Sequence, residues 1–280
     1  MTEKRTITAE DLYRIQTPQT PRLSPDGERV IFSLTRIDQT TQKKTSNLYL
    51  ITVKDGVQRQ FTFGDQIDAS PEWSPDGSTI AFLSNRGDKE KPLQIYLLPA
   101  SGGEARPLTE FKGEINGYCW SPDGTKILFN GIKMDAEVVE RQEDENKRKL
   151  GVVSRHITRL TYKLDGYGFL PKEREHIWVV DTATKETRQL TDHAVFDEQQ
   201  TSWSEDGKRI VFLSNRQPDP DMDVYAVDIF TMPAEGGEFT KLNTPRGGKN
   251  APVFSPDGKW IAYYGADDEG KMYENNDIWV

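Results

Sequence analysis

The sequence predicts an all-β protein, a β-propeller built from four-stranded antiparallel blades. One four-residue phrase, Ser-Pro-Asp-Gly or Ser-Glu-Asp-Gly, recurs along the chain with its serine at Ser24, Ser74, Ser121, Ser204 and Ser255. Each copy follows a bulky residue and precedes a strand of aliphatic-x-aromatic pattern. Self-similarity with a period of about 40–50 residues is typical of propellers and solenoids, in which each repeat is one supersecondary unit.

Each phrase predicts a tight β-hairpin. Serine suits the first position of a type I turn, proline presets φ at the second, and aspartate tolerates the third, while glycine takes the left-handed conformation at the fourth. A type I turn followed by a left-handed residue gives a hairpin with a bulge. We therefore interpret these glycines as turn residues and not as a phosphate-binding loop.

A lead-in segment with a short helix is expected over residues 1–20. Thr8-Ala9-Glu10-Asp11 resembles an N-terminal capping box, and Pro18 and Pro21 end the helix. The helix is either a simple tether or an element that packs on whatever follows the propeller.

The propeller is expected over residues 21–280. In the second half of each repeat an aliphatic–aromatic pair opens the third strand, as at Leu48-Tyr49, and the fourth strand ends twelve residues later, at Phe61 in the first repeat. This spacing is constant in four repeats, which predicts four complete blades with short connections. The blades are expected at about residues 21–63, 68–110, 115–191, 200–243 and 250–280.

The fifth blade is expected to be incomplete. Its aromatic residue is Trp279, so its closing strand would lie beyond Val280. This pattern predicts that the chain is an N-terminal fragment of a longer protein. It also predicts self-association of the isolated piece, because an open strand edge exposes unpaired backbone groups.

The third repeat contains an insertion at about residues 135–172, between its second and third strands. Its first part, residues 137–149, is a charge run that suits a solvated helix or a mobile loop. Its second part, residues 160–169, predicts a hairpin that turns at Asp165-Gly166. Long insertions on a rigid scaffold often carry function, and the alternative is a decorated surface loop.

The composition argues against several partners. The chain has 36 Lys+Arg against 45 Asp+Glu, a formal net charge of −9, so we expect no nucleic-acid or anionic-membrane partner. Residues 1–15 contain no apolar signal-peptide core, and no segment approaches ~18 consecutive apolar residues. The single cysteine, Cys119, has no partner for an internal disulfide and occupies a variable strand position. The prediction is a cytoplasmic protein.

No catalytic, cofactor-binding or metal-ligating residue is predicted. The sequence contains no G-x-S-x-G nucleophile elbow, no HExxH and no CxxC. Asp219-x-Asp221-x-Asp223 imitates the start of a calcium loop, but the glycine and glutamate required later in that loop are missing. An acidic surface loop is the better interpretation of these aspartates, with a weak cation site as the alternative.

Several other polar residues are predicted to be structural. The pairs Gly102-Gly103 and Gly236-Gly237 are expected in hairpin turns. Leu83-Ser84-Asn85-Arg86 recurs as Leu213-Ser214-Asn215-Arg216, and the repeated arginine is predicted to form a hydrogen-bond fork between blades, with a substrate contact as the alternative. The three histidines are scattered and expected to be structural: His156, His176 and His193.

With this register, the chain resembles the N-terminal propeller of the prolyl oligopeptidase family of serine peptidases, especially its acylaminoacyl-peptidase-like branch. The resemblance covers essentially the whole chain. It rests on the five hairpins, Ala9-Glu10-Asp11-Leu12, the insertion segment from Thr161 to Gly168, and His176-Ile177-Trp178. Tol-type propellers share the hairpin phrase, whereas the first segment and the insertion favour the peptidase family.

The resemblance implies a propeller that restricts entry to a Ser-Asp-His site in a C-terminal α/β-hydrolase domain, which is absent from this chain. Peptide substrates would bind through that missing domain, and the parent protein would be a serine-type peptidase that cleaves short or N-acylated peptides. The dipeptidyl-peptidase branch holds the substrate amine with a Glu-Glu pair, and this sequence contains no Glu-Glu dipeptide, which disfavours strict aminodipeptidase activity. The alternative function is a non-catalytic Tol-like or WD-repeat-like propeller that binds a protein partner.

Overall fold

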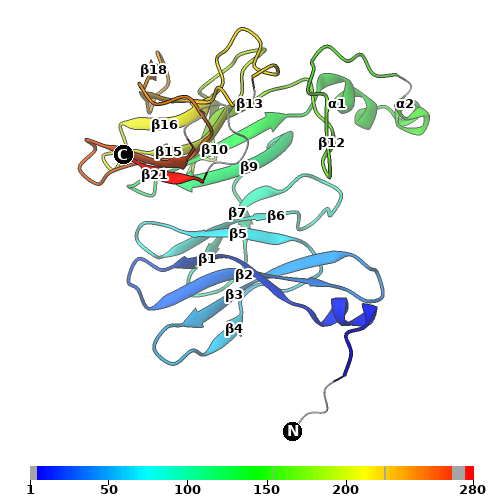
Figure 1. Cartoon of the computed structure of the whole chain (residues 1–280). Helices are drawn as coiled ribbons and strands as arrows, with labels where there is room; N and C mark the ends of the chain where they lie inside the picture. Colours follow the sequence, from blue (N-terminus) through cyan, green and yellow to red (C-terminus); the bar gives the residue numbers. More distant parts are fainter. Residues whose placement is uncertain (1–4, 153, 224, 267–274) are drawn as a thin grey trace. The chain divides into compact units, whose positions relative to one another are not determined.

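The computed structural model describes residues 5–152, 154–223, 225–266 and 275–280, and it confirms an all-β propeller architecture. The strands form consecutive antiparallel sheets in two compact units, Met1–Glu110 and Phe111–Val280 (Figure 1). Within each sheet the strands follow one another in chain order, because tight hairpins connect sequential strands.

Unit 1 holds two four-stranded sheets after a short lead-in helix. The helix η1 (Ala9–Arg14) is a 3-10 helix, and the Thr8 backbone N–H donates to the Asp11 carboxylate at 2.9 Å, as expected for a capping box. The first sheet consists of β1 (Thr17–Leu23), β2 (Arg29–Ile37), β3 (Lys44–Thr52) and β4 (Gln58–Gln60). The second consists of β5 (Asp68–Trp73), β6 (Thr79–Ser84), β7 (Gln94–Pro99) and β8 (Arg106–Pro107).

Unit 2 holds the next three sheets of the repeat. The third sheet consists of β9 (Gly113–Trp120), β10 (Lys126–Lys133), β13 (Glu175–Asp181) and β14 (Thr187–Gln189). The fourth consists of β15 (Glu198–Trp203), β16 (Arg209–Ser214), β17 (Asp228–Pro233) and β18 (Thr240–Lys241). The fifth consists, among the described residues, of β19 (Lys249–Phe254), β20 (Ile261–Gly265) and β21 (Asp277–Trp279).

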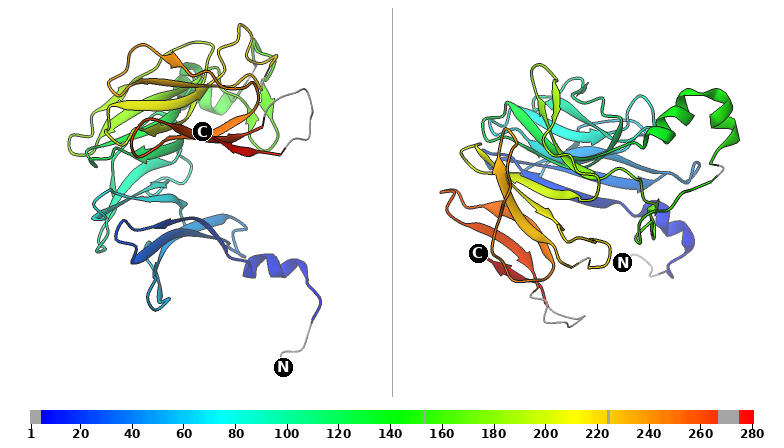
Figure 2. Two further views of the ribbon diagram at one scale, coloured as in Figure 1. Left: turned by 60° about the vertical axis from the view of Figure 1, so that its left-hand side comes forward. Right: turned by 90° about the horizontal axis from the view of Figure 1, so that it is seen from above.

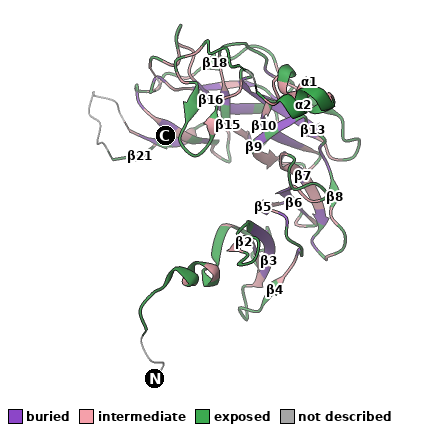
Figure 3. Cartoon of the chain, turned by 90° about the vertical axis from the view of Figure 1, so that its right-hand side faces the viewer, coloured by how far each residue is buried: buried purple, intermediate pink, exposed green. Residues whose placement is uncertain are grey.

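The segment between β10 and β13 carries the predicted insertion. It contains α1 (Ala136–Glu143), α2 (Glu145–Leu150) and a separate two-stranded sheet of β11 (Lys163–Leu164) and β12 (Gly168–Phe169). Figure 2 shows the two helices outside the stack of strands. No residue of either helix is buried, as the charge run predicts for a solvated helix (Figure 3).

The five repeated turns have the predicted geometry. In each, the glycine N–H donates to the serine carbonyl at 2.8–2.9 Å, and the glycine φ lies between +67° and +74°. The serine hydroxyl donates to the aspartate carboxylate at 2.5–2.7 Å. These hydrogen bonds hold the pKa of each turn aspartate below its usual value, and that of Asp76 falls to about 2.

Replacing Gly27 with alanine is expected to destabilise unit 1 by about 1 kcal/mol, because a left-handed backbone places Cβ against the following carbonyl. Gly27 has φ +74° and no heavy atom within 4 Å of an added Cβ, so backbone strain is the main cost. Urea denaturation measures the effect. Gly117→Ala is the matched control, since an added Cβ also meets nothing within 4 Å there and the backbone is not left-handed. Equal stability of the two variants would contradict the turn assignment.

In three blades a threonine at the end of the fourth strand is hydrogen-bonded to the third strand. Thr62, Thr109 and Thr191 each accept a hydrogen bond at 2.9 Å from the backbone N–H of the aliphatic residue that opens the third-strand pair. All three threonines are buried. The twelve-residue spacing in the sequence therefore reflects a side-chain contact as well as a strand length.

Within each unit the core lies between neighbouring sheets. One phenylalanine in the second strand of three blades is completely buried: Phe82, Phe129 and Phe212. In unit 1, Ile31 and Leu48 of the first sheet pack with Trp73 and Phe82 of the second. In unit 2, a corresponding cluster joins the third and fourth sheets. The aromatic residue of each predicted exit strand is therefore a packing residue.

The first strand of four blades contains a feature that the sequence did not predict. A non-glycine residue with φ of 46–51° lies four positions before the turn serine: Thr20, Ser70, Gln200 and Ala251. The pairing register of each strand shifts at this point. Such β-bulges bend the strand locally and increase its twist.

Candidate functional site

The insertion is closed at its base by Asp135. One oxygen of this carboxylate accepts hydrogen bonds from the backbone N–H groups of Lys172 and Glu173, at 2.9 and 3.1 Å. The Lys172 ammonium reaches Glu137 at 2.7 Å. Because both ends of the insertion meet at Asp135, β10 and β13 pair without interruption from Lys126 to Ile132.

The hairpin β11–β12 is attached to the first strand of its blade. Its turn at Asp165-Gly166 agrees with the sequence prediction. The Tyr167 hydroxyl donates to Glu114 in β9 at 2.6 Å, and burial, followed by the contact with Glu114, raises the pKa of Tyr167. The hairpin is thereby fixed over the start of β9.

An ion pair joins the insertion to the fourth blade. Arg159 donates from Nη2 and Nε to the two carboxylate oxygens of Asp221 at 3.1 and 3.3 Å, and the Thr161 N–H adds a bond at 3.1 Å. Burial raises the pKa of Asp221, but the hydrogen bonds from Arg159 and Thr161 outweigh it, so the pKa lies below its usual value. Bidentate pairing of this kind fixes orientation as well as distance.

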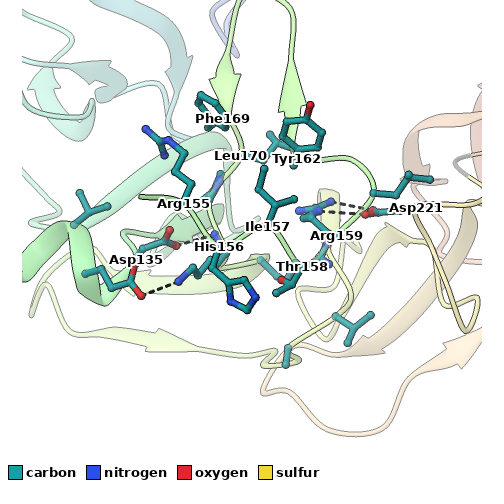
Figure 4. A pocket seen from close by; sticks show the side chains of 18 of the residues that line it. Asp135, Arg155, His156, Ile157, Thr158, Arg159, Tyr162, Phe169, Leu170 and Asp221 are labelled. Atoms are coloured by element: carbon teal, nitrogen blue, oxygen red, sulfur yellow. Dashed lines mark hydrogen bonds and ion pairs between the residues drawn. The ribbon is translucent and has the colours of Figure 1, made fainter. Parts of the chain in front are cut away.

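A cavity of about 420 Å³ lies between the insertion and the loops before β15 and β17. Figure 4 shows Tyr162, Phe169 and Leu170 on one side and His156 and Arg159 on another. Its lining combines apolar and aromatic side chains with several guanidinium groups. Pockets that bind small ligands have this composition, an apolar wall with a few polar groups that fix orientation.

Arg155 has an unusual position in this cavity. Its guanidinium carbon lies 4.1 Å from the centre of the Phe169 ring, a cation–π contact. Among the described residues no hydrogen-bond acceptor or carboxylate partner is found for Arg155. The guanidinium plane is therefore supported while its N–H donors remain available.

Buried carboxylates lie next to the cavity, where β13 and β15 begin. Arg174 lines the cavity and pairs with Asp197 at 3.2 Å. Glu175 is 6 % exposed and accepts from the Gln199 side chain at 2.9 Å. Burial, reinforced by the nearby Asp197 and Glu198, raises the pKa of Glu175 to about 7.

Each of the two repeated arginines pairs with an acid of its own blade and not of the neighbouring blade, which corrects the expectation from the sequence. Arg86 pairs with Asp68 at 2.9 Å, and Arg216 pairs with Glu198. Each acid opens the first strand of the same blade as its arginine. The link between blades comes instead from His176 of the third sheet, whose Nδ1 lies 2.7 Å from Glu198 of the fourth.

The remaining residues singled out in the sequence have structural partners or lie in turns. Asp221 pairs with Arg159 and its side chain is 10% exposed, which corrects the expectation of a solvated acidic loop at this residue, and Asp223 pairs with Arg246. Both glycine pairs lie in hairpin turns, where Gly102 and Gly236 donate to proline carbonyls at 2.9 Å. His193 stacks on Phe196 with ring centres 4.3 Å apart.

The described residues hold no group of three or more His, Cys, Asp or Glu side chains that could bind a metal ion. Within the same part of the chain, no helix has the length and apolar character needed to cross a membrane.

The cavity was not predicted from the sequence. Its walls come from parts of the chain that are distant in sequence, residues 135–174 and two loops of the fourth blade. The only available signal was the break in an otherwise regular spacing, which located the insertion without indicating what it encloses.

Comparison with known proteins agrees with this architecture. The profile of the TolB β-propeller domain family matches residues 2–158. An uncharacterised peptidase of Bacillus subtilis, YuxL, is 33% identical over 213 residues, which is 76% of this chain and 32% of the relative. Dipeptidyl-peptidase 5 of Porphyromonas endodontalis is 27% identical over 273 residues, covering 91% of this chain and 37% of the relative. The chain thus spans about a third of the length of these curated relatives.

Solved structures show the same fold. The acylaminoacyl peptidase of Pyrococcus horikoshii superposes with a TM-score of 0.73 at 22% identity, over 96% of this chain and 38% of that protein. TolB of Agrobacterium tumefaciens gives a TM-score of 0.57 at 20% identity, over 91% of this chain and 72% of that protein.

The fold and the relatives together define a peptidase-associated β-propeller. The chain belongs to the TolB β-propeller domain family. The resemblance to the propellers of prolyl oligopeptidase-type peptidases, expected from the sequence, is confirmed.

Proposed function

We propose that this chain is the substrate-gating propeller of a cytoplasmic serine peptidase that hydrolyses short or N-acylated peptides. The observation that carries the proposal is the similarity to a peptidase of Bacillus subtilis, at 33% identity over 76% of this chain. The catalytic residues would belong to a hydrolase domain outside these 280 residues.

The insertion supports a gating role. Several of its apolar and aromatic side chains are exposed and line one cavity, including Leu160 at 64%, Tyr162 at 44% and Phe169 at 44%. Exposed patches of this kind mark interaction sites. Three anchors hold this patch in place, at Asp135, Glu114 and Asp221, so it can present a fixed surface to a peptide or to a neighbouring domain.

A non-catalytic propeller that binds a protein partner is the second candidate. The observation in its favour is the family match itself, together with the superposition on TolB. The two functions differ in one respect that can be measured, which is whether the complete gene product contains a reactive serine.

A serine-reactive fluorophosphonate probe is expected to label the complete gene product and not the 280-residue chain. The physical reason is that the probe needs an activated nucleophile, and the chain contains no nucleophile elbow. Labelling is read by in-gel fluorescence and mass spectrometry, with hydrolysis of chromogenic acyl-amino-acid and dipeptidyl substrates measured in parallel.

The substrate series also separates the two peptidase classes among the relatives. Hydrolysis of acylated substrates with little cleavage of dipeptidyl substrates is the expected pattern, because the chain lacks a Glu-Glu pair. An unlabelled complete gene product would contradict the peptidase proposal and favour the protein-binding propeller.

A further inference from the structure

We propose that the cavity on the insertion binds the C-terminal end of a short peptide, with the free carboxylate at Arg155 and the last apolar side chain against the aromatic wall. This inference deepens the proposed function, and it rests on that function for the source of the peptide. The binding itself is a property of the 280-residue chain.

The carboxylate position follows from the geometry of Arg155. The cation–π contact with Phe169, at 4.1 Å from the ring centre, restrains the guanidinium, and no other partner for its N–H groups is found among the described residues. A guanidinium edge presents N–H groups in the fork that matches a carboxylate. Because the plane is already restrained, less conformational entropy is lost when a carboxylate binds.

The lining carries a small excess of positive charge, five Arg or Lys side chains against four carboxylates. Three of the carboxylates already have partners: Asp135 holds the backbone at Lys172, Glu137 pairs with that lysine's ammonium, and Asp221 pairs with Arg159, which leaves Asp219 as the fourth. Arg155, in contrast, has no carboxylate partner among the described residues. A ligand carboxylate would therefore complete the local pairing without displacing an existing ion pair.

The apolar part of the ligand has a surface to contact. Tyr162 and Phe169 lie with ring centres 6.2 Å apart, and Ile157 and Leu170 line the same cavity (Figure 4). Tyr162, Phe169 and Ile157 are between 44% and 48% exposed, so contact with an apolar side chain would remove them from water. A peptide that ends in leucine carries both groups on its last residue: a carboxylate for Arg155 and an apolar side chain for the aromatic wall.

The test titrates the 280-residue chain with N-acetyl-glycyl-L-leucine and, separately, with its C-terminal amide, observed by NMR. The two ligands have nearly the same shape and differ in charge. We expect the carboxylate form to bind in the millimolar range and the amide about tenfold more weakly, the loss expected for one charge-assisted hydrogen-bonded pair.

Two substitutions locate the carboxylate. Arg155→Gln is expected to weaken binding of the carboxylate form about tenfold, to the level of the amide. Arg155→Lys keeps the charge but loses the paired N–H donors, so its affinity for the carboxylate form should lie between those of the parent and of Arg155→Gln. Arg148→Gln, on exposed helix α2 and outside the cavity lining, is the control and should leave binding unchanged. Equal melting temperatures of the variants show that they are folded.

Three results would each overturn the carboxylate site. They are equal affinities for the acid and the amide, no saturation up to about 20 mM, and unchanged binding of the acid by Arg155→Gln. If the complete gene product lacks a reactive serine but the chain still discriminates acid from amide, the peptidase proposal fails and the binding site stands.

Discussion

Replacing Arg216 with methionine is expected to lower the free energy of unfolding by about 3–5 kcal/mol, because it leaves the Glu198 carboxylate buried without its cation. Glu198 is 0% exposed, and Arg216 Nη2 donates to it. The same arginine donates to the Ser214 hydroxyl at 2.9 Å and lies over Phe196 and Phe239. His176 remains at 2.7 Å from Glu198, but a single contact does not replace the guanidinium.

The matched control is Arg188→Met. Arg188 pairs with Glu235 at 2.8 Å, but the two side chains are 47% and 71% exposed, so the expected cost is about 0–1 kcal/mol. Urea denaturation of both variants gives the comparison. Adding Glu198→Gln to Arg216→Met should recover part of the loss, since the buried charge is then removed. A cost for Arg216→Met no larger than that for Arg188→Met would show that the buried pair does not stabilise the blade.

Replacing Glu175 with glutamine is expected to stabilise the protein by about 2–3 kcal/mol at pH 8 and to have little effect near pH 4. Burial raises the pKa of Glu175 from 4.5 to about 7, so the folded protein binds the proton more tightly than the unfolded chain. The stability that this proton contributes is present below pH 4.5 and is lost as pH rises through 7. Glutamine keeps the contact with Gln199 and carries no charge.

The measurement is urea denaturation at several pH values between 4 and 8. Because Asp197 and Glu198 also act on Glu175, the informative quantity is the difference in the free energy of unfolding between variant and parent at each pH. Glu186→Gln, on an exposed turn, is the control, and its difference in the free energy of unfolding from the parent should not change with pH. If the difference for Glu175→Gln also does not change with pH, the pKa of Glu175 is not raised by burial.

Local sequence predicted the repeated parts of this fold because their causes are local. A Ser-Pro-Asp-Gly phrase contains its own hydrogen-bond donors, acceptors and backbone preferences, so its geometry was predictable at all five positions. The left-handed residues at Thr20, Ser70, Gln200 and Ala251 were not predictable from residue type. Tertiary strand pairing imposes that conformation on side chains that do not prefer it.

The functional surface was predictable only in part, for a related reason. The partners Arg86–Asp68 and Arg216–Glu198 are both separated by 18 residues, a repeated signal that could have assigned the fork to one blade. The Arg155–Phe169 contact and the cavity around it occur once. Without a second copy to compare, the sequence located the insertion but not its internal packing.

The closure of the insertion at Asp135 has a consequence for the evolution of this protein. The hydrogen bonds to Lys172 and Glu173 isolate residues 136–171 from the hairpin register of the blade. We expect substitutions and length changes between those points to alter the wall of the cavity more than the pairing of β10 with β13, which does not include this segment. If the cavity binds a ligand as proposed, selection on ligand preference acts mainly on this segment and little on the pairing of β10 with β13.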